Sequence, residues 1–329
     1  MTVLVTGGSG FVGLNVLEAL LTNGETVISC DLGPVPGPAL QTFGGLAGTL
    51  HEETLDVRDR AAVLALVARF RPSKVVHAAA ISPAAGAELE AAGSIVAVNI
   101  GGTVNLLDAA HMAGADRIII LSSAAVYGKA GFRFPLLTEE TPAEPTSIYG
   151  ISKFAAEQIA LRYRDLGCDL AALRLGSIFG PWEHVTSVRG TISPMWQILE
   201  LAKQGGPIRL PRPGRRDWIY GRDVGAAVVA ALDFPGRVPA LVNIGAGSQW
   251  TVADFCSQMS EAGVALDWAI DPTEPNVDYH GPRDRAPLST VVLREFLNFS
   301  PRFDIRSAIV DYLAWAEANR RRVPRQDQA

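Results

Sequence analysis

The sequence predicts an α/β protein with a Rossmann-type, doubly wound parallel sheet and a smaller C-terminal substrate lobe. Two observations lead to this prediction. Short β-branched runs alternate with segments whose apolar residues recur every three or four positions, the spacing of amphipathic helices. The glycine-rich run TGGSGFVG, residues 6–13, also stands between the first expected strand and the first expected helix. Such alternation favours a parallel sheet with helices on both faces.

The expected elements follow one another regularly through the first half of the chain. Strands are expected at 3–5, 26–30, 74–77, 117–121 and 170–173, and helices at 11–22, 59–70, 95–113 and 150–166. Beyond residue 176 the alternation weakens and Pro and Gly become frequent. We therefore expect one domain over 1–175, with returning segments near 217–247, and a second, interleaved lobe over 176–329. A closing helix is expected at 305–321 and a disordered tail at 323–329.

Composition limits the class of protein. The chain has 329 residues, 48% hydrophobic and 19% charged, with a net charge of −5. These values are typical of a globular enzyme and leave no basic face for nucleic acid or a membrane surface. No apolar run approaches the roughly 20 residues of a membrane span, and no signal peptide is recognised, so a cytoplasmic protein is expected. Cys30, Cys168 and Cys256 lack metal-ligand spacing and are read as reduced thiols, so no metal site is predicted.

The glycine run has the spacing of a dinucleotide-binding loop. Gly7, Gly10 and Gly13 permit a tight turn, close approach to a pyrophosphate and close helix–strand packing, with the phosphates at the helix N-terminus. Asp31 ends the second expected strand, where it can accept hydrogen bonds from ribose hydroxyls and repel a 2′-phosphate. No Lys or Arg precedes Arg58 to offset that repulsion. The sequence therefore favours NAD over NADP.

Three neighbouring features have less specific interpretations. Asp56 either contacts the adenine or caps the helix at 59–70. His77 is interpreted as a packed residue at a strand end and not as a catalyst. The Pro- and Gly-rich stretch 33–45 is expected to be a long loop beside the adenosine.

A Ser/Tyr/Lys set supplies proton chemistry. Tyr149 and Lys153 are four residues apart and share a helix face. A nearby ammonium is expected to lower the tyrosine pKa from about 10 towards the working pH, which makes Tyr149 a general acid/base. Ser123 ends an apolar strand and can hold the substrate oxygen. Since neighbouring strand residues point to opposite faces, only one of Ser122 and Ser123 can do so.

These motifs together resemble the extended short-chain dehydrogenase/reductase family, the NAD-dependent epimerase/dehydratases, over residues 2–315. The resemblance implies that Ser123, Tyr149 and Lys153 are catalytic, that Lys153 also binds the nicotinamide ribose, and that two subunits pair through helices near 99–113 and 150–166. It rests on TGGSGFVG (6–13), Asp31, HAAA (77–80), VNIGGTVNLLDAA (98–110), SSAAVYG (122–128), YGISK (149–153), LRLGSIFGP (173–181), RRDWIYGRDV (215–224) and NIGAG (243–247).

From the motifs and this resemblance we expect two sets of contacts. The cofactor-binding set is Gly7, Gly10, Phe11, Val12, Gly13, Asp31, Asp56, Val57, Ala78, Ala79, Ala80, Asn99, Ser122, Tyr149 and Lys153. The substrate-binding set is Ser82, Ser123, Ala124, Tyr149, Ser177, Arg189, Arg216 and Arg283.

Departures from the family pattern narrow the reaction. Ala124 and Ala125 stand where 4,6-dehydratases carry an Asp-Glu pair, and Ala125 also replaces the cysteine of members that epimerise through an enol. Neither elimination of water nor enol chemistry is therefore expected. Direct hydride transfer remains, either transient in an epimerase or net in a dehydrogenase.

The substrate indications point in two directions. Arg216 matches the arginine that grips a diphosphate in nucleotide-sugar members. However, Ser177 and Thr191 replace usual asparagines, and the segment GPRD displaces an expected arginine to Arg283 or Arg285. LRLGS (173–177) and HAAAIS (77–82) are similar to uronate dehydrogenases of the family. The sequence thus favours an NAD-dependent dehydrogenase of a small sugar or sugar acid, with a nucleotide-sugar 4-epimerase that retains its NAD as the alternative. A non-catalytic NAD sensor is a third class, which NADH production would distinguish.

Overall fold

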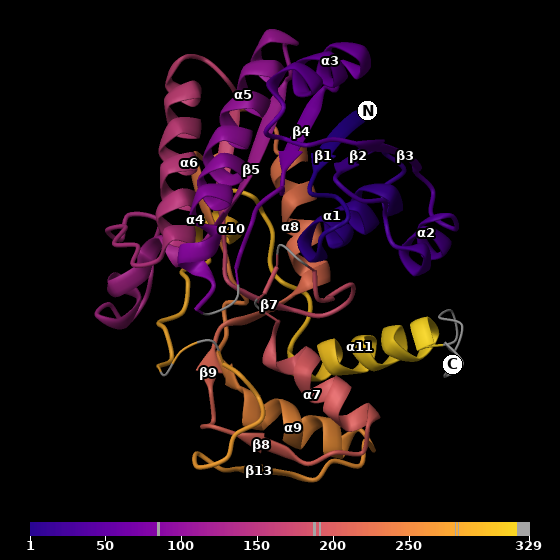
Figure 1. Ribbon diagram of the computed structural model, residues 1–329, viewed down its shortest axis with the longest axis vertical. Coiled ribbons are helices and arrows are strands. Elements are labelled where there is room, and N and C mark those ends of the chain that lie inside the picture. Colours follow the sequence, from indigo (N-terminus) through magenta and orange to yellow (C-terminus); the bar gives the residue numbers. More distant parts are fainter. Residues whose placement is uncertain (84–85, 187–188, 191, 280, 282, 321–329) are drawn as a thin grey trace.

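A seven-stranded parallel sheet forms the upper part of the molecule (Figure 1). The structure, a computed structural model, describes residues 1–83, 86–186, 189–190, 192–279, 281 and 283–320. The strand order is β11-β6-β5-β4-β1-β2-β3, which confirms the expected fold class. The strands are β1 Thr2–Thr6, β2 Thr26–Asp31, β3 Thr49–Thr54, β4 Lys74–His77, β5 Arg117–Ser123, β6 Leu170–Leu175 and β11 Leu241–Ile244.

Helices cover both faces of this sheet. One apolar cluster joins the strands to α1 (Phe11–Thr22) and α8 (Gly221–Asp233). A second cluster joins them to α3 (Arg60–Phe70), α5 (Thr103–Met112) and α6 (Ile148–Asp165). Burial on both faces explains why the central strand β5 is buried over all but its last residue and contains the uninterrupted apolar run 118–121.

Several elements of the N-terminal half differ from those expected from the sequence. The stretch expected to be a loop contains helix α2, Gly37–Phe43, which begins beside a proline at a position that tolerates its missing N–H. The edge strand β3 has the polar sequence TLHEET and a largely exposed surface, so it carries no apolar signal. The single helix expected at 95–113 is a chain of α4 (Glu88–Val96), a π-helical turn (Ala97–Gly102) and α5.

The second lobe lies below the sheet in Figure 1 and is interleaved with it. After β11 has joined the sheet, the chain leaves it again. An aromatic core, including Phe179, Tyr220, Trp250, Phe255 and Tyr312, holds the lobe together. The elements outside the sheet domain are β7 Ser177–Phe179, α7 Pro194–Lys203, β8 Ile208–Leu210, β9 Arg215–Arg216, β10 Trp218–Tyr220, β12 Trp250–Thr251, α9 Val252–Glu261, β13 Trp268–Ile270 and α11 Ile305–Arg320. The short helix α10, Val291–Glu295, returns to pack against β11 of the sheet.

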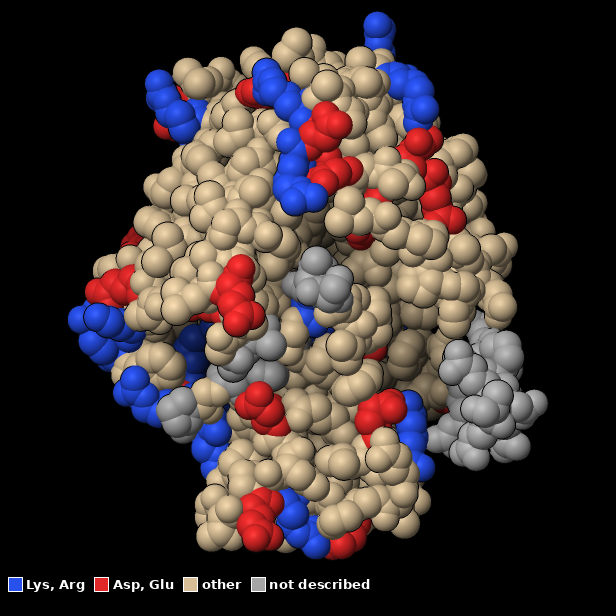
Figure 2. Space-filling view, in the orientation of Figure 1, with Lys and Arg blue, Asp and Glu red and all other residues tan. Residues whose placement is uncertain are grey.

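Surface charge and helix length are features that set nucleic-acid-binding and membrane proteins apart. On the face drawn in Figure 2, basic and acidic side chains are interspersed, so neither sign covers it. Within the described ranges, no helix is both long and apolar enough to cross a membrane. The tail expected to be disordered, residues 323–329, lies outside the described residues.

Candidate active site

A cavity of about 580 Å³ lies at the carboxyl ends of the parallel strands, next to the C-terminal lobe. Its walls come from segments far apart in the chain. The sheet domain contributes the glycine loop, Asp31 and the ends of β5 and α6, and the C-terminal lobe contributes three arginines. Ligands of open α/β sheets bind at this edge, outside the carboxyl ends of the strands.

The glycine loop shows which of its glycines the fold itself requires. Gly7 has φ +71°, and a Cβ there would lie 2.5 Å from the Ala79 nitrogen. A Cβ on Gly13 would lie 2.0 Å from the Gly7 carbonyl oxygen. A Cβ on Gly10 would meet only that same oxygen, at 3.4 Å, and Gly10 borders the cavity. The fold thus leaves free the space beside Gly10 at the start of α1, which is where a dinucleotide pyrophosphate would fit.

The Asp31 carboxylate is oriented by backbone hydrogen bonds. Its carboxylate accepts hydrogen bonds from the backbone N–H of Ser9 at 3.0 Å and of Leu32 at 2.7 Å. Burial raises the pKa of Asp31, while these two N–H groups and the charge of His184 lower it. The carboxylate lines the cavity one strand away from the glycine loop, as the ribose contact expected from the sequence requires.

Asp56 does not cap helix α3. The cap is Asp59, whose side chain accepts a hydrogen bond from the Ala62 N–H at 3.0 Å. Asp56 instead forms an exposed ion pair with Arg58 at 2.6 Å. Neither Asp56 nor Val57 lines the cavity.

The segment after β4 forms part of the cavity wall. Ala78 and Ala80 line the cavity, whereas Asn99 does not. The Asn99 side chain donates to the Ile81 carbonyl and to Ser152 Oγ, at 3.1 and 2.9 Å, and so ties this segment to α6.

His77 is packed as expected from the sequence. It lies between the hydroxyls of Thr6 and Thr103, and burial lowers its pKa to about 3, which keeps it neutral.

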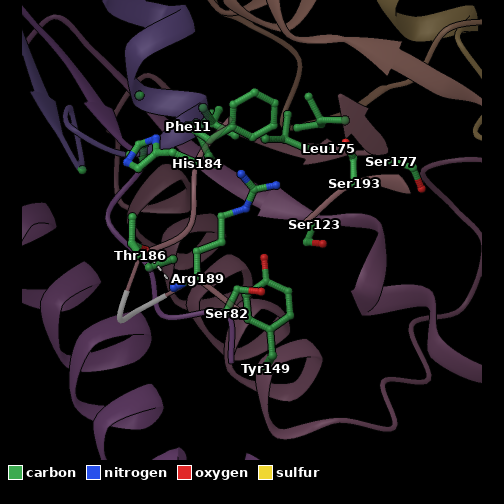
Figure 3. Close-up of a pocket in the computed structure, with 18 of the residues that line it drawn as sticks. Phe11, Ser82, Ser123, Tyr149, Leu175, Ser177, His184, Thr186, Arg189 and Ser193 are labelled. Carbon is green, nitrogen blue, oxygen red and sulfur yellow. Dashed lines mark hydrogen bonds between the residues drawn. The ribbon is translucent and has the colours of Figure 1, made fainter. Parts of the chain in front are cut away.

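Ser123, Tyr149 and Lys153 all line the cavity. Ser123 ends β5, and Tyr149 lies in the first turn of α6 with Lys153 one turn later. Figure 3 shows Ser123 near the hydroxyl end of Tyr149, and the Ser123 hydroxyl accepts a hydrogen bond from the Ala125 N–H at 3.1 Å. Lys153 Nζ donates to the Leu121 carbonyl at 2.7 Å.

Burial dominates the titration of these groups. It lowers the pKa of Lys153 to about 8. It also raises the pKa of Tyr149, and a hydrogen bond with Ser123 and the charge of Arg189 act in the opposite direction. We had expected Lys153 to lower the Tyr149 pKa. That expectation is not met, because the ammonium is bonded to a backbone carbonyl and the loss of solvent around the phenol is the larger effect.

Of the two adjacent serines, Ser123 directs its side chain to the cavity. Ser122 donates to the Glu157 carboxylate at 3.0 Å, and Glu157 also receives two hydrogen bonds from Arg174. This buried ion pair fixes α6 against β5 and β6, and hence Tyr149 and Lys153 relative to Ser123.

On the substrate side, Ser82, Ser177, Arg189 and Arg216 line the cavity. Ala124 does not, although its neighbour Ala125 does. Thr191 lies outside the described residues.

The choice of Arg283 as a substrate contact is corrected by the structure. Its guanidinium lies 4.4 Å over the Phe132 ring, and Arg285 faces the cavity in its place. Burial, and next the charge of Arg285, lower the pKa of Arg216 to about 10. The sequence had offered both arginines, and only the path of the chain separates them. His184, Thr186 and Ser193 also line the cavity and were missed, because no local pattern marks them.

A glycine loop on a parallel sheet that shares a cavity with Ser123, Tyr149 and Lys153 defines a dinucleotide-dependent oxidoreductase of the Rossmann type. The family model of the NAD dependent epimerase/dehydratase family matches residues 3–245. The chain belongs to this family and is an NAD-dependent enzyme.

Named relatives give the context. The chain is 29% identical over 290 residues to dTDP-L-rhamnose 4-epimerase of Burkholderia thailandensis, covering 77% of this chain and 78% of that one. It is 31% identical over 268 residues to the low-salt glycan biosynthesis protein Agl12 of Haloferax volcanii, covering 80% and 82%.

Two solved structures are similar over nearly their whole length. MoeE5 in complex with UDP-glucuronic acid and NAD has a TM-score of 0.78 at 25% identity, covering 97% of this chain and 100% of that one. A UDP-glucose 4-epimerase from Stenotrophomonas maltophila with bound NAD and formylated UDP-arabinopyranose has a TM-score of 0.81 at 25% identity, covering 98% and 100%.

Proposed function

We propose that the protein transfers a hydride at a secondary hydroxyl of a nucleoside-diphosphate sugar and acts as a 4-epimerase. The observation that carries this proposal is the pair Arg216 and Arg285, which face the cavity that also contains Ser123 and Tyr149. The sequence argument for a substrate without a nucleotide was based on the replaced asparagines and on the displaced arginine of the GPRD segment. Two guanidinium groups offer the planar, multiple donors that suit a diphosphate. The relatives named above that carry an epimerase name act on dTDP- or UDP-sugars.

The chain's own residues supply the proton chemistry. Ser123 holds the substrate oxygen, and Tyr149 removes the hydroxyl proton when the alcohol is oxidised and returns it on reduction. Lys153 keeps two N–H donors free beyond the one bonded to the Leu121 carbonyl, and we assign these to the nicotinamide ribose. Bound NAD supplies the hydride acceptor. Ala124 and Ala125 offer no acid or base for elimination of water, which supports hydride transfer without dehydration.

We assign NAD binding to residues 1–175, with the returning segments near 217–247, and substrate binding mainly to residues 176–329.

The three cysteines are free, and Cys30 and Cys256 are buried, which supports the proposal of a cytoplasmic enzyme.

A dehydrogenase of a small sugar acid is the second candidate. Ser177, at the cavity wall, favours it, because a short hydroxyl stands where nucleotide-sugar members carry an asparagine. A sugar acid would pair its carboxylate with one of the cavity arginines, and NADH would leave after each turnover.

One experiment separates the two candidates. Purified protein is incubated with UDP-glucose, UDP-galactose or dTDP-sugars and the products are resolved by chromatography. Parallel reactions with galacturonate or glucuronate and NAD are followed by NADH absorbance. Tyr149→Phe serves as the inactive variant, and Tyr163→Phe, on the same helix but outside the cavity, as its matched control. Interconversion of nucleotide sugars without free NADH supports the epimerase. Stoichiometric NADH from a uronate, with inert nucleotide sugars, overturns it.

We also propose a homodimer. Met112 on α5 and Ile151 on α6 are exposed apolar side chains within the two helices through which pairing was expected, and Leu89 and Val96 are exposed on α4, which precedes them. Light scattering coupled to gel filtration should give twice the chain mass, and Ile151→Glu should reduce it. A single-chain mass for the unmodified protein would contradict the proposal.

A further inference from the structure

Arg189 is held by a carboxylate that has no exposure to solvent. Arg189 Nη2 donates to Glu183 Oε1 at 2.7 Å, and the Glu183 side chain is fully buried. Glu183 also accepts hydrogen bonds from the Ser193 N–H and hydroxyl. A buried charge persists only when it is paired and hydrogen-bonded, so this arrangement fixes one side of the Arg189 guanidinium.

The other side of the guanidinium faces the cavity without a partner. Within the described part of the chain, Arg189 Nη1 is buried and has no hydrogen-bond acceptor. The guanidinium carbon lies 4.3 Å from the centre of the Phe11 ring, and Phe11 is the first residue of α1. Figure 3 shows the Arg189 side chain reaching between Phe11 and the Ser123–Tyr149 pair.

The N-terminus of α1 beside Arg189 has no anionic side chain of its own. A helix N-terminus carries partial positive charge, so a cation beside it is unfavourable unless an anion lies between them. The first turn of α1 contains no acidic residue, and Gly10 offers no side-chain cap. An anionic ligand in the space beside Gly10 would satisfy both the N-terminus of α1 and the unpartnered Nη1 of Arg189.

We propose that Arg189, positioned by Glu183, is the cationic partner of the cofactor pyrophosphate. The sequence before Arg58 contains no Lys or Arg, so the segment that carries the glycine loop offers no cation of its own. Of the other cations that line the cavity, Lys153 is bonded to the Leu121 carbonyl, and Arg216 and Arg285 come from β9 and the segment near 285. The C-terminal lobe thus supplies the countercharge for a ligand of the N-terminal domain. This proposal assigns Arg189 to the cofactor, whereas the sequence analysis placed it among the substrate-binding residues.

Direct binding measurements on the full chain test the proposal independently of the sugar substrate. Arg189→Met is titrated calorimetrically with NADH, with ADP-ribose, which keeps the pyrophosphate but lacks nicotinamide, and with adenosine, which lacks both. A hydrogen bond to a charged group contributes about 1.5–3 kcal/mol, so NADH and ADP-ribose should bind about ten- to a hundred-fold more weakly. Adenosine binding should not change. Arg216→Met, which removes another cavity arginine, should bind NADH as the parent does.

A second variant guards against misfolding, since Arg189→Met leaves Glu183 buried without its cation. Glu183→Gln combined with Arg189→Met removes both charges and should show the same loss for NADH and ADP-ribose. Arg189→Lys should restore part of it. Unchanged NADH and ADP-ribose affinities in Arg189→Met and the double variant would overturn the proposal, as would an equal loss for adenosine.

Discussion

The three glycines of the loop should respond differently to one added methyl group. In Gly10→Ala the new Cβ meets only the Gly7 oxygen, at 3.4 Å, and otherwise points into the cavity. Alanine is a poorer N-cap than glycine by about 0.5–1 kcal/mol, and this loss is offset by the ~0.4–1 kcal/mol that alanine gains from a less flexible unfolded chain. The free energy of unfolding should therefore change by less than about 1 kcal/mol.

Gly7→Ala and Gly13→Ala should instead destabilise the protein. A left-handed backbone costs alanine about 1–2 kcal/mol, and at Gly7 the Cβ would also lie 2.5 Å from the Ala79 backbone nitrogen. At Gly13 a Cβ 2.0 Å from a carbonyl oxygen forces the backbone to move, which costs at least the ~1–3 kcal/mol of overpacking.

Two assays separate these effects. Thermal unfolding without cofactor should show Gly10→Ala close to the parent, and the other two variants several degrees lower. Calorimetric titration should show Gly10→Ala binding NADH at least about tenfold more weakly, because the methyl group keeps a phosphate from the N–H groups of α1. Parental NADH affinity in Gly10→Ala, or parental stability in Gly13→Ala, would refute the assignment of this loop.

Three further outcomes are expected. Tyr149→Phe should lower turnover by about 10²–10⁴-fold with NADH affinity unchanged, and near-normal turnover would reject Tyr149 as the acid/base. Asp31→Ala should weaken NADH binding and reduce the ratio of NADH affinity to NADPH affinity, measured in paired titrations. If the parent protein bound NADPH more tightly than NADH, the role given to Asp31 would be contradicted. The pKa of Lys153 is about 8 in the folded protein and 10.5 in the unfolded chain. Between these pH values the unfolded chain binds more protons than the folded protein, so the free energy of unfolding should rise from pH 8 to 10.5, by about 3 kcal/mol at most. Urea unfolding at several pH values should show this rise for the parent and a smaller dependence on pH for Lys153→Met. The same pH dependence in both proteins would exclude a buried ammonium whose charged form is destabilised.

Features encoded in short stretches were predictable from the sequence. The glycine loop, the apolar central strands and the four-residue spacing of Tyr149 and Lys153 depend on local geometry, and the structure brings them into one cavity. The polar edge strand β3 was missed because it carries no alternating apolar pattern. Asp59 caps α3 in place of Asp56, a shift of three residues that the acidic run did not resolve.

The far wall of the cavity depends on contacts between distant segments. Arg285 faces inward because the segment after it is aligned by Leu137, whose backbone N–H donates to the Pro287 carbonyl and whose carbonyl accepts from the Ser289 N–H. Arg189 is directed by Glu183, which carries no recognisable motif. Neither orientation follows from spacing along the sequence, and the expectation that Arg283 would serve as the contact was wrong for that reason.

The late return of the chain to the sheet has a consequence during synthesis on the ribosome. Strand β11 pairs with β6, and α8 covers the apolar face that α1 shares, yet both elements lie beyond residue 220. At about 5–20 residues per second, synthesis from the end of β6 to the end of β11 takes about 3–14 s, and the nascent sheet keeps that face uncovered for this time. A truncated chain ending near residue 175 would keep the glycine loop but leave the same face open to aggregation. Chaperone capture of the nascent protein should therefore end only after residue 244 has emerged.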